Sequence, residues 1–119
     1  MAPLVADLTD ADMRDLAAYY AYLPRVTGSG SSAGEPPRIV ASGAPLRGIA
    51  PCGACHGEVD SKASAAWLEG QPGIYLRTQI EAFATGARHN DIGEQMRNIA
   101  RRMTAAEIAA ASEFYADRP

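Results

Sequence analysis

The run Cys-Gly-Ala-Cys-His at positions 52–56 is the strongest chemical signal in the chain. Two thiols three positions apart lie on one side of a helical turn, so both can form thioethers with the same edge of a porphyrin. The imidazole of His56 would then lie beneath the ring, where a ring nitrogen can bind iron. The pattern therefore predicts one covalently attached haem c, held by Cys52 and Cys55 and ligated by His56.

Three other uses of these cysteines are open. A redox-active dithiol has its C-x-x-C beside a βαβ pattern, which the sequence does not show, and it has no need of His56. A zinc ion could take Cys52, Cys55, His56 and His89, but adjacent residues point in different directions and rarely share one tetrahedral ion. A disulfide between the two cysteines would close a very short loop and stabilise little. The haem interpretation is the favoured one.

Length and composition limit what else the protein can be. The chain has 119 residues, a net charge of −3, a pI near 5.3 and only 7% aromatic residues. This is room for one domain, or one domain and a fragment, and its thin core needs a staple such as a large cofactor. The acidic balance argues against nucleic-acid binding, because a phosphate backbone requires a basic surface. No apolar run is long enough to cross a bilayer.

Two helices are predicted from their N-terminal caps, over residues 8–23 and 104–116. Each begins with a threonine at the N-cap and an acidic residue three positions later, which is a capping box: Thr9 with Asp12, and Thr104 with Glu107. Aligning the two caps also places Leu8 on Met103 and Tyr20 on Tyr115. We interpret this as a repeat, with chance similarity of two alanine-rich amphipathic helices as the alternative.

Three more helices are expected, over residues 38–42, 71–86 and 91–102. The second has apolar residues at helical spacing, and Gly86 suits its C-terminal cap. The third has one apolar stripe, made by Ile92, Met96, Ile99 and Met103. Residues 43–51 are expected to be irregular. No segment indicates a strand, so the predicted fold class is all-α.

Four segments share their pattern and order with a known family: CGACHG at 52–57, LEGQP at 68–72, YLRTQIEAFATGAR at 75–88, and the block 96–108 that ends in MTAAEI. Through them the chain resembles the class I c-type cytochromes, most closely the second lobe of the two-lobed dihaem bacterial cytochromes of the c4 type. The resemblance implies a small helical bundle around one haem. It assigns the domains as a helix from the end of a preceding lobe at 1–25, a flexible Gly/Ser/Pro-rich linker at 26–35, and a cytochrome c domain at 36–119.

The resemblance also implies the second iron ligand. Met96 occupies the family's ligand position, in an M-x-x-I-A pattern before the last capping box, and a thioether opposite an imidazole raises the reduction potential of iron. Core packing on the predicted stripe is the alternative for Met96. Met103 aligns with Leu8 in the repeat, so it is interpreted as apolar filling. His89 is the other candidate for this second ligand, but it stands in a polar loop and is expected to be solvated.

Residues around the haem are implied in the same way. Trp67 and Tyr75 are candidates to pack on the haem edge or to bond a propionate, with plain core packing as the alternative. Arg88 is a candidate partner for a propionate, with exposure to solvent as the alternative. In the family a proline carbonyl orients the proximal imidazole. Ala66 stands in its place here, which keeps the carbonyl but loses the rigidity of the proline. Met1 aligns with Met96 in the repeat, either as a ligand of a missing lobe or simply as the first residue.

These observations predict a function in electron transport. A haem iron with two axial ligands carries single electrons between redox partner proteins, and the chain is predicted not to be an enzyme. The alternatives are a haem domain or subunit of a larger oxidoreductase and, third, a haem-based ligand sensor. Covalent haem attachment in bacteria takes place outside the cytoplasmic membrane. The start of the chain lacks the features of a secretory signal, so we expect an excised or mature part of an exported, periplasmic protein, with an upstream haem lobe missing from it.

Overall fold

The computed structural model describes residues 5–23, 34–57 and 65–118. Helices are the only regular elements within these ranges, and a single isolated bridge joins Ala44 to Ile49, so the all-α fold class is confirmed. Met1 and most of the linker predicted at 26–35 lie outside the described residues. The elements, in chain order, are α2 (Asp10–Tyr22), α3 (Arg38–Ala41), η1 (Pro45–Arg47), α4 (Cys52–His56), α5 (Gly73–Thr85), η3 (Ile92–Glu94), α6 (Gln95–Ala100) and α7 (Ala105–Ala116).

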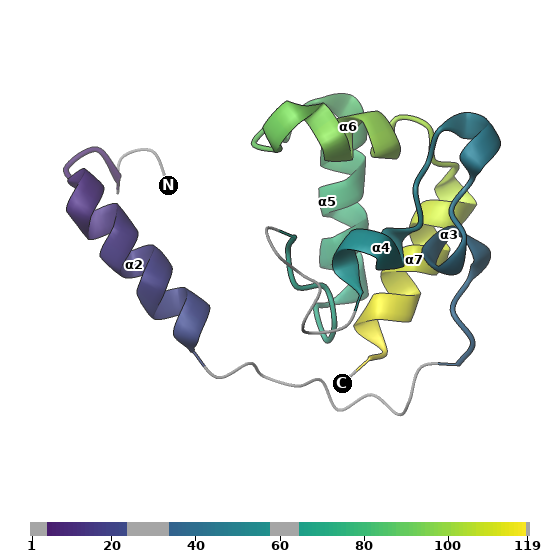
Figure 1. Ribbon diagram of the computed structural model, residues 1–119, viewed down its shortest axis with the longest axis horizontal. Coiled ribbons are helices and arrows are strands. Elements are labelled where there is room, and N and C mark those ends of the chain that lie inside the picture. Colours follow the sequence, from purple (N-terminus) through teal and green to yellow (C-terminus); the bar gives the residue numbers. More distant parts are fainter. Residues whose placement is uncertain (1–4, 24–33, 58–64, 119) are drawn as a thin grey trace.

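The helices from α3 onward pack around one small core. Helix α5 packs against both α6 and α7, and α3 packs against α4 and α7 (Figure 1). The core consists of apolar side chains from α3, α5, α7 and the loop before α4: Ile39, Val40, Ile49, Leu76, Ala111 and Tyr115. Helix α4, which carries the Cys-x-x-Cys-His run, is therefore held from one side by α3 and the core.

Both capping boxes are present and fix the starts of α2 and α7. Thr9 accepts a hydrogen bond from the backbone N–H of Asp12 at 3.2 Å, and Thr104 accepts one from the N–H of Glu107 at 3.2 Å. Each acidic side chain in turn accepts from the N–H of its own N-cap. The helix predicted over 71–86 is also confirmed, because α5 ends at Gly86, whose φ of 82° suits a residue without a Cβ.

The helix predicted over 91–102 is interrupted. Gly93 and Glu94 both have left-handed backbone conformations, with φ of 64° and 59°, so a 3-10 turn (η3) precedes a shorter helix, α6. The two segments therefore do not share one helical face, and the predicted stripe is wrong at Ile92, which is 88% exposed. The segment expected to be irregular, 43–51, contains the short 3-10 helix η1.

Helix α2 has 13 residues and none of them is buried, whereas α5 and α7, the other two long helices, both contribute buried side chains. Large apolar and aromatic side chains of this helix, including Met13, Leu16, Tyr19 and Tyr20, are exposed. None of the described helices combines the length and the apolar character that crossing a membrane requires.

Candidate functional site

Helix α4 begins directly after Pro51, its N-cap. The carbonyl oxygen of Pro51 accepts a hydrogen bond from the N–H of Ala54 at 3.0 Å. The helix lies close to α3, since a Cβ on Gly53 would stand only 3.2 Å from the carbonyl oxygen of Val40. A larger residue at position 53 would push the two helices apart. The glycine between the two cysteines therefore serves the packing of α4 on α3.

The two thiols lie in different environments. Cys52 packs against the core, whereas Cys55 is exposed on the same helical turn, and both are free cysteines. Burial raises the pKa of the Cys52 thiol, which keeps it protonated at neutral pH. A redox-active dithiol needs the opposite, a lowered pKa. The raised pKa thus disfavours the dithiol, and no disulfide joins the two cysteines.

The residues that a zinc site would need are not brought together either. Within residues 5–23, 34–57 and 65–118, no group of three or more His, Cys, Asp or Glu side chains is placed to hold a metal ion. His89, the fourth ligand that this alternative required, is an exposed residue in the loop after α5.

The imidazole of His56 is oriented by a main-chain carbonyl. Its Nδ1 lies 2.8 Å from the carbonyl oxygen of Ala66. A carbonyl can only accept, so Nδ1 must carry the proton and donate it, which leaves the lone pair on Nε2 free. A hydrogen bond of this kind, to the ring nitrogen that does not bind the metal, fixes the tautomer and the orientation of a metal-binding histidine. Alanine at position 66 therefore retains the carbonyl contact despite the absence of the proline.

Met96 lies on the first turn of α6 and is half-buried. Its neighbours on the predicted stripe behave differently, because Ile99 and Met103 pack against the core and Ile92 is exposed. Among the described residues, Met96 is not one of the side chains that pack on this core. Met103 thus behaves as the apolar residue that was predicted, and the core-packing alternative for Met96 lacks support.

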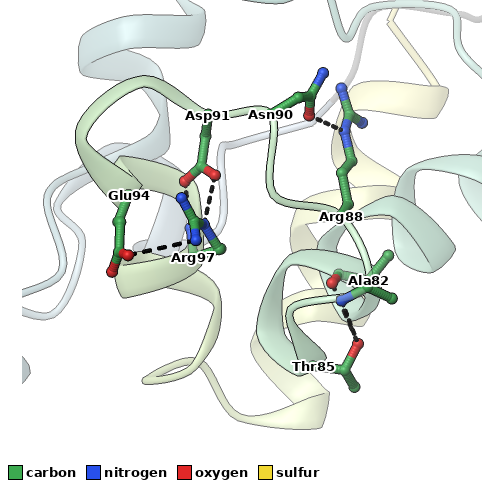
Figure 2. A network of polar contacts seen from close by, with 8 residues as sticks. Ala82, Thr85, Arg88, Asn90, Asp91, Glu94 and Arg97 are labelled. Carbon is green, nitrogen blue, oxygen red and sulfur yellow. Dashed lines mark hydrogen bonds and ion pairs between the residues drawn. The ribbon is translucent and has the colours of Figure 1, made fainter.

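The loop before Met96 is held by a buried carboxylate (Figure 2). Asp91 accepts from the backbone N–H of Arg97 at 3.0 Å and from its Nε at 2.7 Å. Burial by itself would raise the pKa of Asp91, but these hydrogen bonds outweigh it and the pKa is lowered. A non-glycine residue with positive φ, here Glu94, costs on the order of 1–3 kcal/mol and persists only where its surroundings hold it.

Arg88 is not free in solvent. Its guanidinium donates to Gln79 at 2.8 Å and to Asn90 at 3.0 Å, and it lies over the ring of Phe83 at 4.5 Å from the centroid. These contacts fix the side chain at the C-terminal end of α5. All of these partners are neutral, so they order the guanidinium without neutralising its positive charge.

The other predicted contacts are placed less tightly. Trp67 is half-buried and directly follows Ala66, and Tyr75 is about half exposed on α5. Sequence reasoning missed Tyr115, whose buried hydroxyl has no hydrogen-bond partner among the described residues. Burial, together with the charges of Cys52 and Glu69, raises its pKa. Its alignment with Tyr20 in the repeat was the available signal.

The donor set fits a covalently attached haem. Both cysteines lie on one turn of α4, the imidazole that follows them keeps the lone pair of Nε2 for a metal, and the thioether of Met96 lies on a separate helix outside the core cluster. A soft thioether and a neutral imidazole are the ligands that low-spin iron takes in electron carriers. With its small all-α bundle, the chain has the class I cytochrome c fold.

Known proteins are similar to this chain in sequence and in fold, although no family model matches the chain. It is 35% identical to cytochrome c4 of Thiocapsa roseopersicina, over 96% of this chain and 62% of that protein. It is 34% identical to the thiosulfate dehydrogenase electron acceptor of Stutzerimonas stutzeri strain A1501, over 98% of this chain and 57% of that protein.

Solved structures agree. Reduced recombinant cytochrome c4 from Pseudomonas stutzeri superimposes with a TM-score of 0.81 at 26% identity, covering 98% of this chain and 64% of that one. The thiosulfate dehydrogenase TsdBA from Marichromatium purpuratum gives a TM-score of 0.77 at 32% identity, covering all of this chain and 27% of that one. The chain is thus a homologue of the cytochromes c4, and it spans about 60% of the length of its curated relatives, consistent with one lobe of a two-lobed class I dihaem cytochrome.

Proposed function

We propose that this chain carries single electrons between redox partner proteins through one haem c. The observation that carries the proposal is the hydrogen bond from Nδ1 of His56 to the carbonyl oxygen of Ala66, on a helix that also presents two free cysteines. This hydrogen bond orients the imidazole and leaves Nε2 able to bind iron. Neither a disulfide nor a redox-active dithiol requires such a histidine. The similarity to cytochromes c4 supports the same function.

Each residue has a role in this proposal. Cys52 and Cys55 would form the two thioethers, and His56, through Nε2, and Met96 would be the two ligands of the iron. The thioethers anchor the haem permanently, and the Ala66 carbonyl holds the imidazole in one orientation. When bound, the haem supplies an iron that gains and loses one electron with little change in its ligands.

A carrier is favoured over an enzyme because His56 and Met96 would both be ligands of the iron. With both as ligands, the iron would have no coordination position open to oxygen or peroxide, so activation of these molecules is disfavoured. Trp67, Tyr75 and Arg88 are proposed to border the haem. Arg88 is the strongest candidate of the three for a propionate contact, because neutral partners hold its charge in place.

The partners follow from charge and from the relatives. The net charge of −3, with two propionates added, favours a basic partner, and this attraction weakens as salt is raised. The relative from Stutzerimonas stutzeri is named as the thiosulfate dehydrogenase electron acceptor, so we propose an oxidoreductase as the electron donor. We place the protein in the bacterial periplasm, where covalent haem attachment occurs.

The domain assignment remains part of the proposal. Residues 1–25 are proposed to be the C-terminal end of a preceding lobe, 26–35 a linker and 36–119 the cytochrome domain. Two observations support it: α2 buries none of its residues, and the alignments cover nearly all of this chain but about 60% of each relative. The likeness to 27% of a thiosulfate dehydrogenase chain favours a haem domain within a larger oxidoreductase as the second candidate.

Met96→Ala tests the proposal in protein expressed with cytochrome maturation machinery. The parent should be low-spin in both redox states, with a haem that resists extraction by denaturant and gives the pyridine spectrum of a thioether-bound haem. The variant should give a high-spin ferrous form that binds carbon monoxide. Met103→Ala, which removes the methionine that packs on the core, should keep the parent spectrum. An unchanged spectrum in Met96→Ala would show that Met96 does not bind the iron.

A further inference from the structure

The backbone between Asp91 and Arg97 has an unusual conformation that hydrogen bonds restrain. Two successive residues, Gly93 and Glu94, adopt left-handed conformations, and α6 begins directly after them. Glu94, the N-cap of α6, makes no side-chain capping hydrogen bond. The first N–H groups of a helix have no partner within it, so α6 needs an acceptor from elsewhere.

Asp91 supplies that acceptor. One carboxylate oxygen accepts from the backbone N–H of Arg97 at 3.0 Å, and the other accepts from the Nε of the same residue at 2.7 Å. The carboxylate is 6% exposed and the guanidinium is 18% exposed, so solvent screens this pair little. Charge-assisted bonds of this geometry are both strong and directional. The carboxylate therefore fixes the residue that directly follows Met96.

The loop that carries Asp91 is also bonded to helix α5. Asn90, the residue before Asp91, accepts from the guanidinium of Arg88 at 3.0 Å. Arg88 is itself anchored on α5, through its backbone N–H to the carbonyl of Ala82 at 3.0 Å and through its side chain to Gln79 at 2.8 Å. The contacts thus run from α5 through the loop to the first turn of α6 (Figure 2).

We infer that Asp91 is a positioning residue for the Met96 thioether: its bonds to Arg97 close the loop and set the first turn of α6 in the orientation that iron ligation requires. This inference rests on the proposed function. The second acidic neighbour, Glu94, contacts the same guanidinium only at 3.4 Å and is 54% exposed, so it contributes less. Without Asp91 the two left-handed residues lose their restraint, and the thioether becomes easier to displace.

Competition by imidazole tests this inference in the oxidised holoprotein. Asp91→Ala should bind imidazole about tenfold more tightly than the parent or better, and should weaken the sulfur-to-iron charge-transfer band. Asp91→Asn keeps an oxygen acceptor but loses the charge, so it should fall between the two. Glu81→Gln, which breaks the exposed Arg77–Glu81 pair on α5, is the matched control and should bind imidazole as the parent does.

The outcomes separate this inference from the proposed function. If Met96→Ala leaves the spectrum and the imidazole affinity unchanged, the proposed ligand is wrong. If Met96→Ala changes both but the Asp91 variants match the parent, the positioning role is wrong. A lowered melting temperature with parental imidazole affinity would mean that Asp91 only stabilises the fold, which also overturns the inference. If Asp91→Ala does not acquire haem, Asp91→Asn decides.

Discussion

Helices α2 and α7 begin with the same capping box but differ in burial, since α2 has no buried residue and α7 has several. In both, a threonine and an acidic residue three positions later exchange hydrogen bonds at the first turn. Yet Tyr115 in α7 is 3% exposed, and Tyr20, its counterpart in the repeat, is 67% exposed. The comparison teaches that residues within one turn are enough to start a helix, whereas burial of a helix face requires other segments to pack against it.

Truncating the paired tyrosines should have the largest effect. Tyr115→Ala should lower the free energy of unfolding by about 3 kcal/mol, because it empties a buried aromatic site between α7, α3 and α5. Tyr20→Ala should change it by less than about 0.5 kcal/mol. Denaturant titration of the holoprotein, followed by far-ultraviolet circular dichroism, gives both values. Equal losses would show that α2 is packed as tightly as α7 in solution.

Acid should reveal the second difference between the helices. The hydrogen bond from Arg47, followed by that from the N–H of Thr104, lowers the pKa of Glu107 from 4.5 to about 2. A lowered carboxylate pKa stabilises the folded state above 4.5, and this stabilisation is lost as pH falls from 4.5 toward 2. Glu107→Gln should therefore be less stable than the parent at pH 6, with the gap closing toward pH 2.

The matched control for that titration is Asp12→Asn. Hydrogen bonds from Thr9 also lower the pKa of Asp12, but that carboxylate caps a helix that buries nothing. The substitution should leave the global unfolding curve unchanged across the same pH range. The ion-pair explanation is wrong if the gap between parent and Glu107→Gln stays constant from pH 6 to pH 2.

Removing the caps should give the smallest effect of the three. Thr104→Ala should lower the free energy of unfolding by about 1 kcal/mol, the usual contribution of an N-cap hydroxyl. Thr9→Ala should reduce the helical circular dichroism signal slightly without moving the unfolding midpoint, because α2 lies outside the core. A matching shift of the midpoint in both variants would mean that the two helices unfold as one cooperative unit.

Expectations drawn from neighbouring residues were largely confirmed. The all-α class, the two capping boxes and the C-terminal cap at Gly86 depend on contacts within a few positions, and the structure contains all of them. The helix expected over 91–102 was wrong in its first turn. Two adjacent left-handed residues break it, and one of them is Glu94, a residue type whose propensity gives no warning of positive φ.

The chemistry of the site could be predicted from the sequence alone, since thiol spacing and an adjacent imidazole are properties of a few consecutive residues. How those groups are held depends on contacts that form only when the chain folds. The carbonyl of Ala66 contacts His56 although ten positions separate them in the sequence. The guanidinium of Arg88 lies over the ring of Phe83 because α5 ends just before Gly86 and the chain turns back there. Such contacts depend on how the chain turns between the partners, and no local pattern encodes that path.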